Sequence, residues 1–347
     1  MAKKLSIVVP VYNEGSGVLA AFDAINEVCR SELPDWDWEI IFVDDGSRDD
    51  SFFHLESICE KHRNAMAIRL AANCGSHRAI RAGMEYAEGD AACFLPCDLQ
   101  EPPELIPRLL QALTDATPVV LAVRSSRQDR WASRMLSRMF FLLARLLISR
   151  RMPANGIGTF LLGSRALKVM TRYKERNLTL GGLLMNMGFP YACVPYDRQA
   201  RHIGETKWTL SKRLDLFVNY FVANSYTPIR LMSWLGIVVA LLGFLWAIVV
   251  VVNWFCFSSP PTGWTSLFVA VLVLGGIQMT MTGIIGEYVW RALDESRARP
   301  VYVVDRVVNQ RKPAKERAEN CQRAVTRPGE HPADDSAGTT PNTFGKS

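Results

Sequence analysis

A long stretch without charge limits what this chain can fold into. Between Leu231 and Gly286 the sequence contains no Asp, Glu, Lys or Arg. Two apolar runs lie within it, at 231–257 and 264–285, and each is near the length of about 20 residues that a membrane-spanning helix needs. The turn-forming sequence SSPPTG separates them and cannot continue a helix. The pattern predicts two transmembrane helices within residues 230–290, with a pair of buried core helices as the alternative.

The charges that flank these runs predict their orientation. TPIR precedes the first run and RALDESRARP follows the second, whereas the loop between them carries no charge. Because basic residues remain on the cytoplasmic side, both termini are expected in the cytoplasm. The chain start, MAKKLSIVVPVY, is too short for a secretory signal and turns directly into a strand pattern. We therefore expect a multi-pass protein of the inner (cytoplasmic) membrane.

The first third of the chain alternates strand and helix patterns. Apolar runs such as LSIVVPVY, WEIIFVDDGS, AMAIRLAAN and AACFLP are separated by helical stretches. This alternation predicts a parallel, doubly wound α/β sheet inside a domain that spans residues 1–229. Ligands of such sheets bind at the carboxyl ends of the strands. Four acidic residues fall at those ends and mark the expected site: Glu14, Asp44, Asp45 and Asp98.

A basic amphipathic segment occupies residues 131–151. Its sequence, WASRMLSRMFFLLARLLISRR, keeps apolar residues at helical spacing, with Arg134, Arg138 and Arg145 on an opposing stripe. Such a helix is typical of a membrane interface, although an ordinary surface helix packed on the core is the alternative. After the apolar runs, residues 291–311 are expected to form a cytoplasmic segment. Residues 312–347, rich in Pro, Ala, Thr and charge, are expected to be a disordered tail.

The net charge of +6 is unevenly distributed, with basic clusters at 124–151, 198–213 and 291–317. Nucleic acid is the first partner that such clusters suggest. Beside two apolar runs, the membrane and its phosphate headgroups are the expected partners instead, and nucleic acid is not expected. None of the eight cysteines forms a CxxC pair, so buried, reduced thiols are predicted.

The strand ends carry groups that suit a nucleotide sugar. VVPVYNE and VDDGSRDD place carboxylates where they can hydrogen-bond ribose hydroxyls and a base edge. Taken singly, Asp45, Ser47 and Asp49 could instead cap the following helix. In CFLPCDLQEPPE, Asp98 and Gln100 provide oxygen ligands for a hard divalent cation such as Mg²⁺ or Mn²⁺.

In combination, these motifs are specific. IVVPVYNE, VDDGSRDDS, CDLQEPPELIPRLL and RHIGETKWTLSK, in that order before two apolar runs, resemble family 2 glycosyltransferases of the polyprenyl-phosphate (undecaprenyl- or dolichol-phosphate) type. The resemblance covers about residues 5–305. It implies a Rossmann-like glycosyltransferase A fold with an amphipathic interface helix and two C-terminal transmembrane helices. It also implies an inverting hexosyl- or pentosyltransferase. Such an enzyme moves a sugar from a nucleotide-diphosphate donor, expected to be UDP-linked, to polyprenyl phosphate at the cytoplasmic face. The product is a lipid-linked monosaccharide for cell-envelope modification, including that of lipopolysaccharide.

The resemblance assigns roles to residues. The positions that match nucleotide-binding residues are Pro10, Tyr12, Glu14, Asp44 and Asp45, and those that match metal ligands are Asp98 and Gln100. Two anions must meet in such a transfer, so cations are required as well. Those expected at the lipid phosphate are Arg124, Arg127 and Arg134 with the hydroxyl of Ser137, and those expected at the nucleotide sugar are Arg201 and Lys207. Asp98, Arg124 and Arg127 are the expected catalytic residues. Relatives often assemble, so a homo-oligomer is expected.

Two departures from the family pattern bear on the metal and the catalytic base. The family turn normally reads Asp-Ala-Asp-Leu-Gln, so Pro96 replaces its first acid. Many relatives carry an Asp, proposed as a catalytic base, where this chain has Thr159. A lipid monophosphate has a second pKa of about 6 and is mostly a dianion at neutral pH. A base therefore contributes little, and charge neutralisation and positioning carry the reaction.

Two alternative functions follow from these departures and from one further motif. A non-catalytic paralogue that binds nucleotide or lipid phosphate is supported by Pro96 and Thr159. A processive polysaccharide synthase needs Gln-x-x-Arg-Trp, but in RQDRW, Gln128 stands only two residues before Arg130. Within the resembling subfamily, RSSRQDRW and Thr159 favour enzymes that load modified arabinose.

Overall fold

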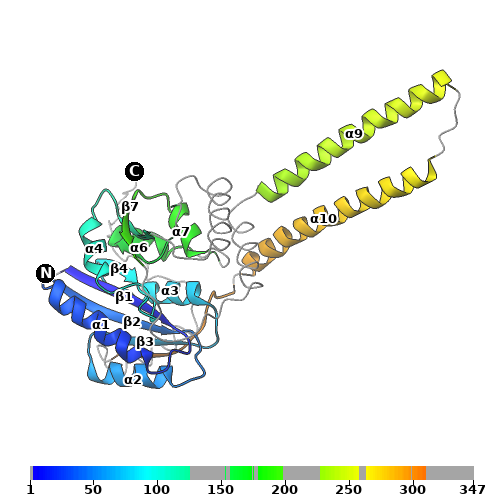
Figure 1. Cartoon of the computed structure of the whole chain (residues 1–347). Coiled ribbons are helices and arrows are strands. Elements are labelled where there is room, and N and C mark those ends of the chain that lie inside the picture. The colour runs from blue at the N-terminus through cyan, green and yellow to red at the C-terminus, as the bar shows by residue number, and fades with distance from the viewer. Residues whose placement is uncertain are drawn as a thin grey trace, which may run out of the picture.

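A computed structural model of the chain describes residues 3–125, 153, 157–173, 175, 179–197, 227–257, 263–297 and 299–309. These residues form an α/β body and a pair of long helices that extends from it (Figure 1). The interface segment expected at 131–151 and the tail expected at 312–347 lie outside the described residues.

The body is built on one sheet, whose described strands run in the order β7-β5-β6-β4-β1-β2-β3-β8. The strands are β1 (Lys3–Val11), β2 (Trp36–Asp44), β3 (Ala65–Leu70), β4 (Ala91–Phe94), β5 (Val119–Arg124), β6 (Phe160–Gly163), β7 (Tyr191–Tyr196) and β8 (Val304–Asn309). The helices are α1 (Gly17–Glu32), α2 (Ser51–Lys61), α3 (Ser76–Glu85), α4 (Leu105–Ala112), α6 (Ser164–Met170), α7 (Leu180–Asn186), α9 (Thr227–Phe257) and α10 (Trp264–Ser296).

The four strands of the first third, β1 to β4, run parallel as predicted, but later strands make the described sheet mixed. β1 pairs in parallel with β2 and β4, and β2–β3 and β5–β7 are parallel as well. β6 runs antiparallel to β4 and β5, and β8 runs antiparallel to β3. The two reversed strands enter the sheet from the edge at which the parallel strands end. That edge therefore collects six strand ends and two strand beginnings.

Two hydrophobic cores hold the sheet between layers of helices. Alternate residues of β1 point to opposite faces: Ile7 and Val9 pack with α1, α2 and α4, whereas Val8 packs with α3, α6 and α7. Because both faces are covered, the strands read as continuous apolar runs. At Gly83 of α3 an added Cβ would lie 2.3 Å from Val8 Cγ1, so α3 packs directly against the sheet.

The chain returns to the sheet after α10. Ala71 N donates a hydrogen bond to Val303 O at 2.9 Å, and Ile68 pairs with Val307 in the β3–β8 register. The segment at 291–311 thus includes a strand that the sequence did not predict. Its pairing fixes the C-terminal end of α10 at the carboxyl edge of the sheet.

α9 and α10 are 31 and 33 residues long and lie side by side (Figure 1). A Cβ at Gly236 of α9 would approach Met281 Cε of α10 to 3.5 Å. Several large apolar side chains on α9 are exposed, including Trp234 and Trp246. Across the part of the chain that the structure describes, no helix combines the length and the apolar character of a membrane span. The two membrane spans therefore stay a prediction from sequence.

Candidate active site

The loops after β1 and β2 are bonded to each other. Asn13 N donates to Ser47 Oγ at 2.9 Å, and Arg48 N donates to Asn13 Oδ1 at 2.9 Å. Glu14 N donates to Ser51 Oγ at 3.0 Å. Asn13 adopts the left-handed conformation, with φ of 53°, which Asn tolerates better than most residues. These bonds fix Glu14 beside the end of β2.

Asp45 links the β2 loop to the start of α3. Its carboxylate accepts hydrogen bonds from Cys74 N at 2.7 Å and Gly75 N at 2.8 Å. Burial raises the pKa of Asp45, and the two amide bonds partly offset that effect. The predicted alternative, a cap on α2, is not what this side chain does, because both of its oxygens are bonded at the start of α3. Asp50 stands at the N-cap position of α2, without a side-chain cap bond.

Asp44 is fully buried at the end of β2. Its Oδ1 accepts a hydrogen bond from Ser47 N at 3.1 Å, and its Oδ2 lies 3.6 Å from Arg69 Nε. Oδ2 has no hydrogen-bond partner among the described residues. Burial raises the pKa of Asp44, against the lowering effects of Ser47 and Arg69. One carboxylate oxygen of Asp44 can therefore still accept a hydrogen bond.

The turn after β4 carries the predicted metal ligands. Leu99 has φ of 52°, and Gln100 N donates to Asp98 Oδ1 at 3.2 Å, so the turn closes on itself. Burial, then the negative charges of Glu14 and Asp98, raises the pKa of the Cys97 thiol. β4 pairs in parallel with β1, so the loops that carry Glu14 and Asp98 leave neighbouring strands at the same edge of the sheet.

The turn offers few protein ligands for a divalent cation. The described residues contain no cluster of three or more His, Cys, Asp or Glu that could hold a metal ion. Asp98 and Gln100 offer one carboxylate and one amide oxygen. Mg²⁺ is usually bound through one or two carboxylates together with substrate phosphates and water. The residues fit an ion of that kind, held mainly through the substrate.

A chain of side-chain hydrogen bonds joins this turn to the ends of β5 and β7. Arg124 Nε donates to the Tyr196 hydroxyl oxygen at 3.3 Å, and the same hydroxyl donates to Glu101 Oε1 at 2.8 Å. Glu101 and Tyr196 are both buried. Burial, followed by the charge of Glu101, raises the pKa of Tyr196 to about 12. The three residues come from the turn after β4 and from the ends of β5 and β7.

Gly158 and Thr159 close the site at the start of β6. A Cβ at residue 158 would lie 2.3 Å from the Tyr196 hydroxyl and 2.9 Å from Glu101 Oε1, so only glycine fits. Thr159 is fully buried, and its hydroxyl donates to the backbone oxygen of Phe94. The Thr159 side chain thus bonds β6 to β4.

Part of the residue set predicted from sequence lies together in the structure. Glu14, Asp44, Asp45, Asp98, Gln100 and Arg124 all lie at the carboxyl edge of the sheet, next to Pro10 and Tyr12 of the β1 end. Arg127, Arg134, Ser137, Arg201 and Lys207 lie outside the described residues. Glu101, Tyr196 and Arg69 were not predicted. Of these three residues, only Glu101 had a signal in the sequence, because it directly follows Gln100 in the metal turn.

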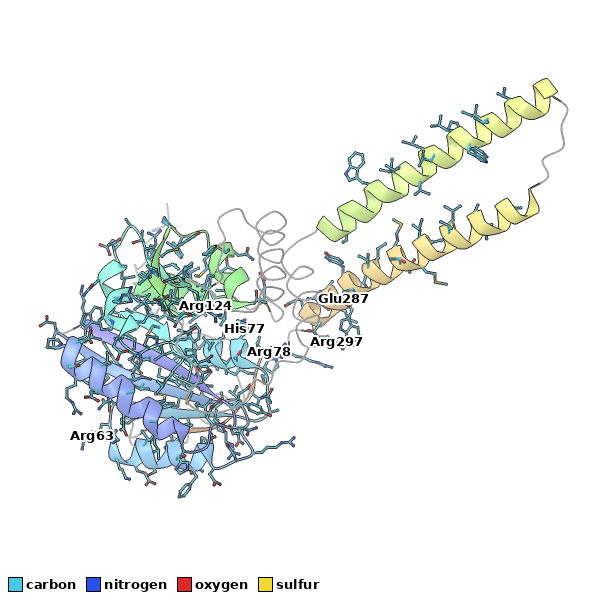
Figure 2. The ribbon with its side chains drawn as sticks, viewed as in Figure 1. Arg63, His77, Arg78, Arg124, Glu287 and Arg297 are labelled. Atoms are coloured by element: carbon cyan, nitrogen blue, oxygen red, sulfur yellow. The ribbon has the colours of Figure 1, made fainter. Side chains whose placement is uncertain are left out.

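The edge with the site also faces the helix pair. Figure 2 shows Arg124, His77 and Arg78 on the side of the body toward α10, where Glu287 and Arg297 stand, whereas Arg63 lies on the far side. β8 joins this edge directly to the end of α10. The end of the helix pair and the candidate site therefore share one side of the protein.

Comparison with known proteins decides the family. The family model described as "Glycosyl transferase family 2" matches residues 6–172 of this chain. An uncharacterized glycosyltransferase of Bacillus subtilis (strain 168) is 34% identical over 302 residues, which cover 87% of this chain and 93% of that protein. The chain belongs to glycosyltransferase family 2. It is thus a glycosyltransferase, as the motifs predicted.

Two other relatives have more specific names. The prophage bactoprenol glucosyl transferase homolog of Escherichia coli (strain K12) is 32% identical over 306 residues, covering 88% of this chain and 99% of that protein. The undecaprenyl-phosphate 4-deoxy-4-formamido-L-arabinose transferase of Enterobacter sp. (strain 638) is also 32% identical, in a match that covers 88% of this chain and 94% of that protein. Equal identity to a glucosyl and an arabinosyl enzyme does not favour either sugar.

Among solved structures, this family 2 chain is similar to glucosyl-3-phosphoglycerate synthase from Mycobacterium tuberculosis in complex with Mn²⁺, uridine diphosphate and phosphoglyceric acid. The match has 17% identity and a TM-score of 0.43, and it covers 64% of this chain and 77% of the other.

Proposed function

We propose that this family 2 glycosyltransferase transfers a sugar from a nucleotide-diphosphate donor, UDP-linked, to undecaprenyl or another polyprenyl phosphate, with inversion. The product is a lipid-linked monosaccharide for the cell envelope. The observation that carries the proposal is the meeting of Glu14, Asp44, Asp98 and Arg124 at one edge of the sheet. The bactoprenol and undecaprenyl-phosphate relatives, similar over almost their whole length, support a polyprenyl phosphate as the acceptor.

In this proposal each group has a separate task. The acids at the ends of β1 and β2 receive hydrogen bonds from the nucleoside, and the second oxygen of Asp44 supplies an acceptor there. Asp98 and Gln100 would hold Mg²⁺ or Mn²⁺, which would neutralise the charge of the leaving diphosphate. Arg124, with Arg127, Arg134 and Ser137, binds the acceptor phosphate, and Arg201 and Lys207 bind the donor phosphates.

The absence of an acid at position 159 agrees with this acceptor. An alcohol acceptor needs a base, because its proton is held far above neutral pH, whereas a phosphate monoester is mostly dianionic. The Thr159 hydroxyl is already bonded to Phe94 O inside the body. Positioning two anions among cations is then the main task of the protein.

We further propose that α9 and α10 cross the inner membrane, with both chain ends and the body in the cytoplasm. The sequence of both helices supports this, since 231–286 lacks charge. The exposed apolar side chains of α9 support it as well, because large exposed apolar surfaces mark contact with lipid or a partner. Retention in alkali-washed membranes and cytoplasmic activity of a C-terminal reporter would test it. A soluble protein or an external C-terminus would contradict it.

The transfer is tested with the full chain in detergent or nanodiscs. Undecaprenyl phosphate is offered with a panel of UDP-, GDP- and dTDP-sugars, with Mg²⁺, Mn²⁺ or chelator, and lipid-linked sugar is detected by mass spectrometry. One UDP-sugar should give a product that carries a single sugar. No product from any donor, while nucleotide still binds, would favour the non-catalytic alternative. A ladder of products would favour a processive synthase.

A further inference from the structure

Three parts of the fold meet at the Tyr196 hydroxyl. It accepts a hydrogen bond from Arg124 Nε at 3.3 Å and donates one to Glu101 Oε1 at 2.8 Å. Arg124 ends β5, Tyr196 ends β7, and Glu101 directly follows the metal turn. A second bond, from Ser125 N to Tyr196 O at 2.8 Å, ties the two strand ends together. The phenol thus connects the arginine to the turn that carries Asp98.

We propose that Tyr196 and Glu101 are positioning residues that hold the Arg124 guanidinium at the phosphate of the lipid acceptor. This inference rests on the proposed function, in which Arg124 binds that phosphate. It adds two residues to the site and states how the acceptor arginine is placed relative to the donor turn.

The direction of the hydrogen bonds supports this role. The phenol is protonated at neutral pH, as any tyrosine with the ordinary pKa of about 10 is, and burial, then the Glu101 carboxylate, raises the pKa of Tyr196 further, to about 12. Its single proton points to the carboxylate, so its oxygen faces Arg124 as an acceptor. The contact uses the Nε–H of Arg124, and the terminal nitrogens are the pair whose planar geometry suits a phosphate.

The space around the phenol is also fixed. Gly158 passes so close that a Cβ there would lie 2.3 Å from the hydroxyl and 2.9 Å from Glu101 Oε1. Gly158 is itself anchored by a hydrogen bond from its N–H to Ala122 O at 2.9 Å. The backbone therefore keeps Tyr196 and Glu101 in one arrangement. A pre-organised arginine loses less conformational freedom when phosphate binds than a mobile one.

The test separates positioning from simple stabilisation. Tyr196→Phe removes only the hydroxyl, Glu101→Ala removes the acceptor, and Glu101→Gln keeps an acceptor oxygen. Tyr173→Phe is the matched control, because its hydroxyl donates to Asn186 O at 3.3 Å in a part of the body away from this network. For the full chain of each variant, the KM values for UDP-sugar and undecaprenyl phosphate are measured together with the melting temperature. Direct binding of a short-chain prenyl phosphate is measured without donor.

Tyr196→Phe and Glu101→Ala should raise the KM for undecaprenyl phosphate about 10-fold, the expected effect of one charge-assisted hydrogen bond. Prenyl phosphate binding should weaken equally, the donor KM should stay constant, and Glu101→Gln and Tyr173→Phe should resemble the wild type. Equal losses for donor and acceptor, an unchanged acceptor KM, or a Gln variant as impaired as the Ala variant would each overturn the inference. If the wild type binds prenyl phosphate but transfers no sugar, the proposed function is wrong, and the binding data alone decide the inference.

Discussion

The hydroxyl of Thr159 donates a hydrogen bond to the backbone oxygen of Phe94, at the point where β4 and β6 meet. Thr159→Val should therefore lower stability by about 1 kcal/mol, the usual net worth of such a bond, and leave kcat within about 3-fold of the wild type. Thr171→Val is the control, because its hydroxyl bonds Lys168 O at 3.2 Å on the exposed surface. A loss of kcat of about 100-fold without a change in melting temperature would mean that Thr159 acts in proton transfer.

Gly158 tests the packing of the site. Gly158→Ala places a methyl group 2.3 Å from the Tyr196 hydroxyl, and such overpacking costs about 1–3 kcal/mol. We expect a lower melting temperature and a raised KM for the lipid acceptor. Gly17→Ala at the start of α1 meets nothing within 4 Å and should be neutral or stabilising. If Gly158→Ala also behaved as the wild type, the close approach to Tyr196 would be wrong.

The raised pKa values of Asp44 and Asp45 predict a pH effect. Burial is the main cause for both carboxyls. As the pH falls from 7, these groups gain protons earlier than ordinary aspartates do, so UDP affinity should weaken above the usual pKa of about 3.9. A carboxyl whose pKa is raised by folding contributes stability at low pH, and that contribution is lost as the pH rises through the folded value. Acidification should therefore weaken UDP binding. The protonation of these two carboxylates should not, however, lower the melting temperature.

Calorimetric titration of UDP and thermal melts across the same pH series provide the check. Asp44→Asn should bind UDP weakly and flatten the pH dependence of binding. UDP affinity that stays constant down to the ordinary Asp pKa would show that neither carboxylate takes part in nucleotide binding.

The fold was predictable where the signal is local. The apolar runs from Leu5 to Leu95 carry the strand pattern, and acids directly follow three of them, so the sheet and its functional edge could be expected. β8 could not, because its pairing with β3 joins segments far apart in sequence, and six residues of mixed polarity carry little periodic signal.

The site residues likewise divide into those with a local sequence signal and those without one. Glu14, Asp44, Asp98 and Gln100 stand in motifs, whereas Tyr196 sits in an ordinary strand and acts through neighbours that only the folded chain supplies. Asp45 shows the limit of motif reading. Its position suggested a helix cap or a nucleotide ligand; its oxygens accept hydrogen bonds from Cys74 and Gly75 at the start of α3 rather than capping α2, and its part in nucleotide binding stays a prediction.

Pro96 tests how the metal turn works. Pro96→Asp adds an acid two residues before Asp98, where the sequence resemblance expects one, and more carboxylate ligands should tighten the binding of a hard cation. We expect the Mn²⁺ concentration for half-maximal activity to fall, with nucleotide binding in chelator unchanged. Pro102→Asp, later in the same turn, is the control. An unchanged Mn²⁺ dependence would show that position 96 does not contact the metal or its water.

Asp98 is the residue on which the proposed transfer depends most directly. The decisive measurement is the rate at which the purified full chain converts undecaprenyl phosphate to a lipid-linked monosaccharide with its best UDP-sugar, compared with Asp98→Ala and with Asp98→Asn. The wild type should form product, and chelator or either substitution should remove nearly all of it while the melting temperature stays within a few degrees. Near-normal turnover by the folded Asp98→Ala protein, or no product from the wild type with any donor, would contradict the account.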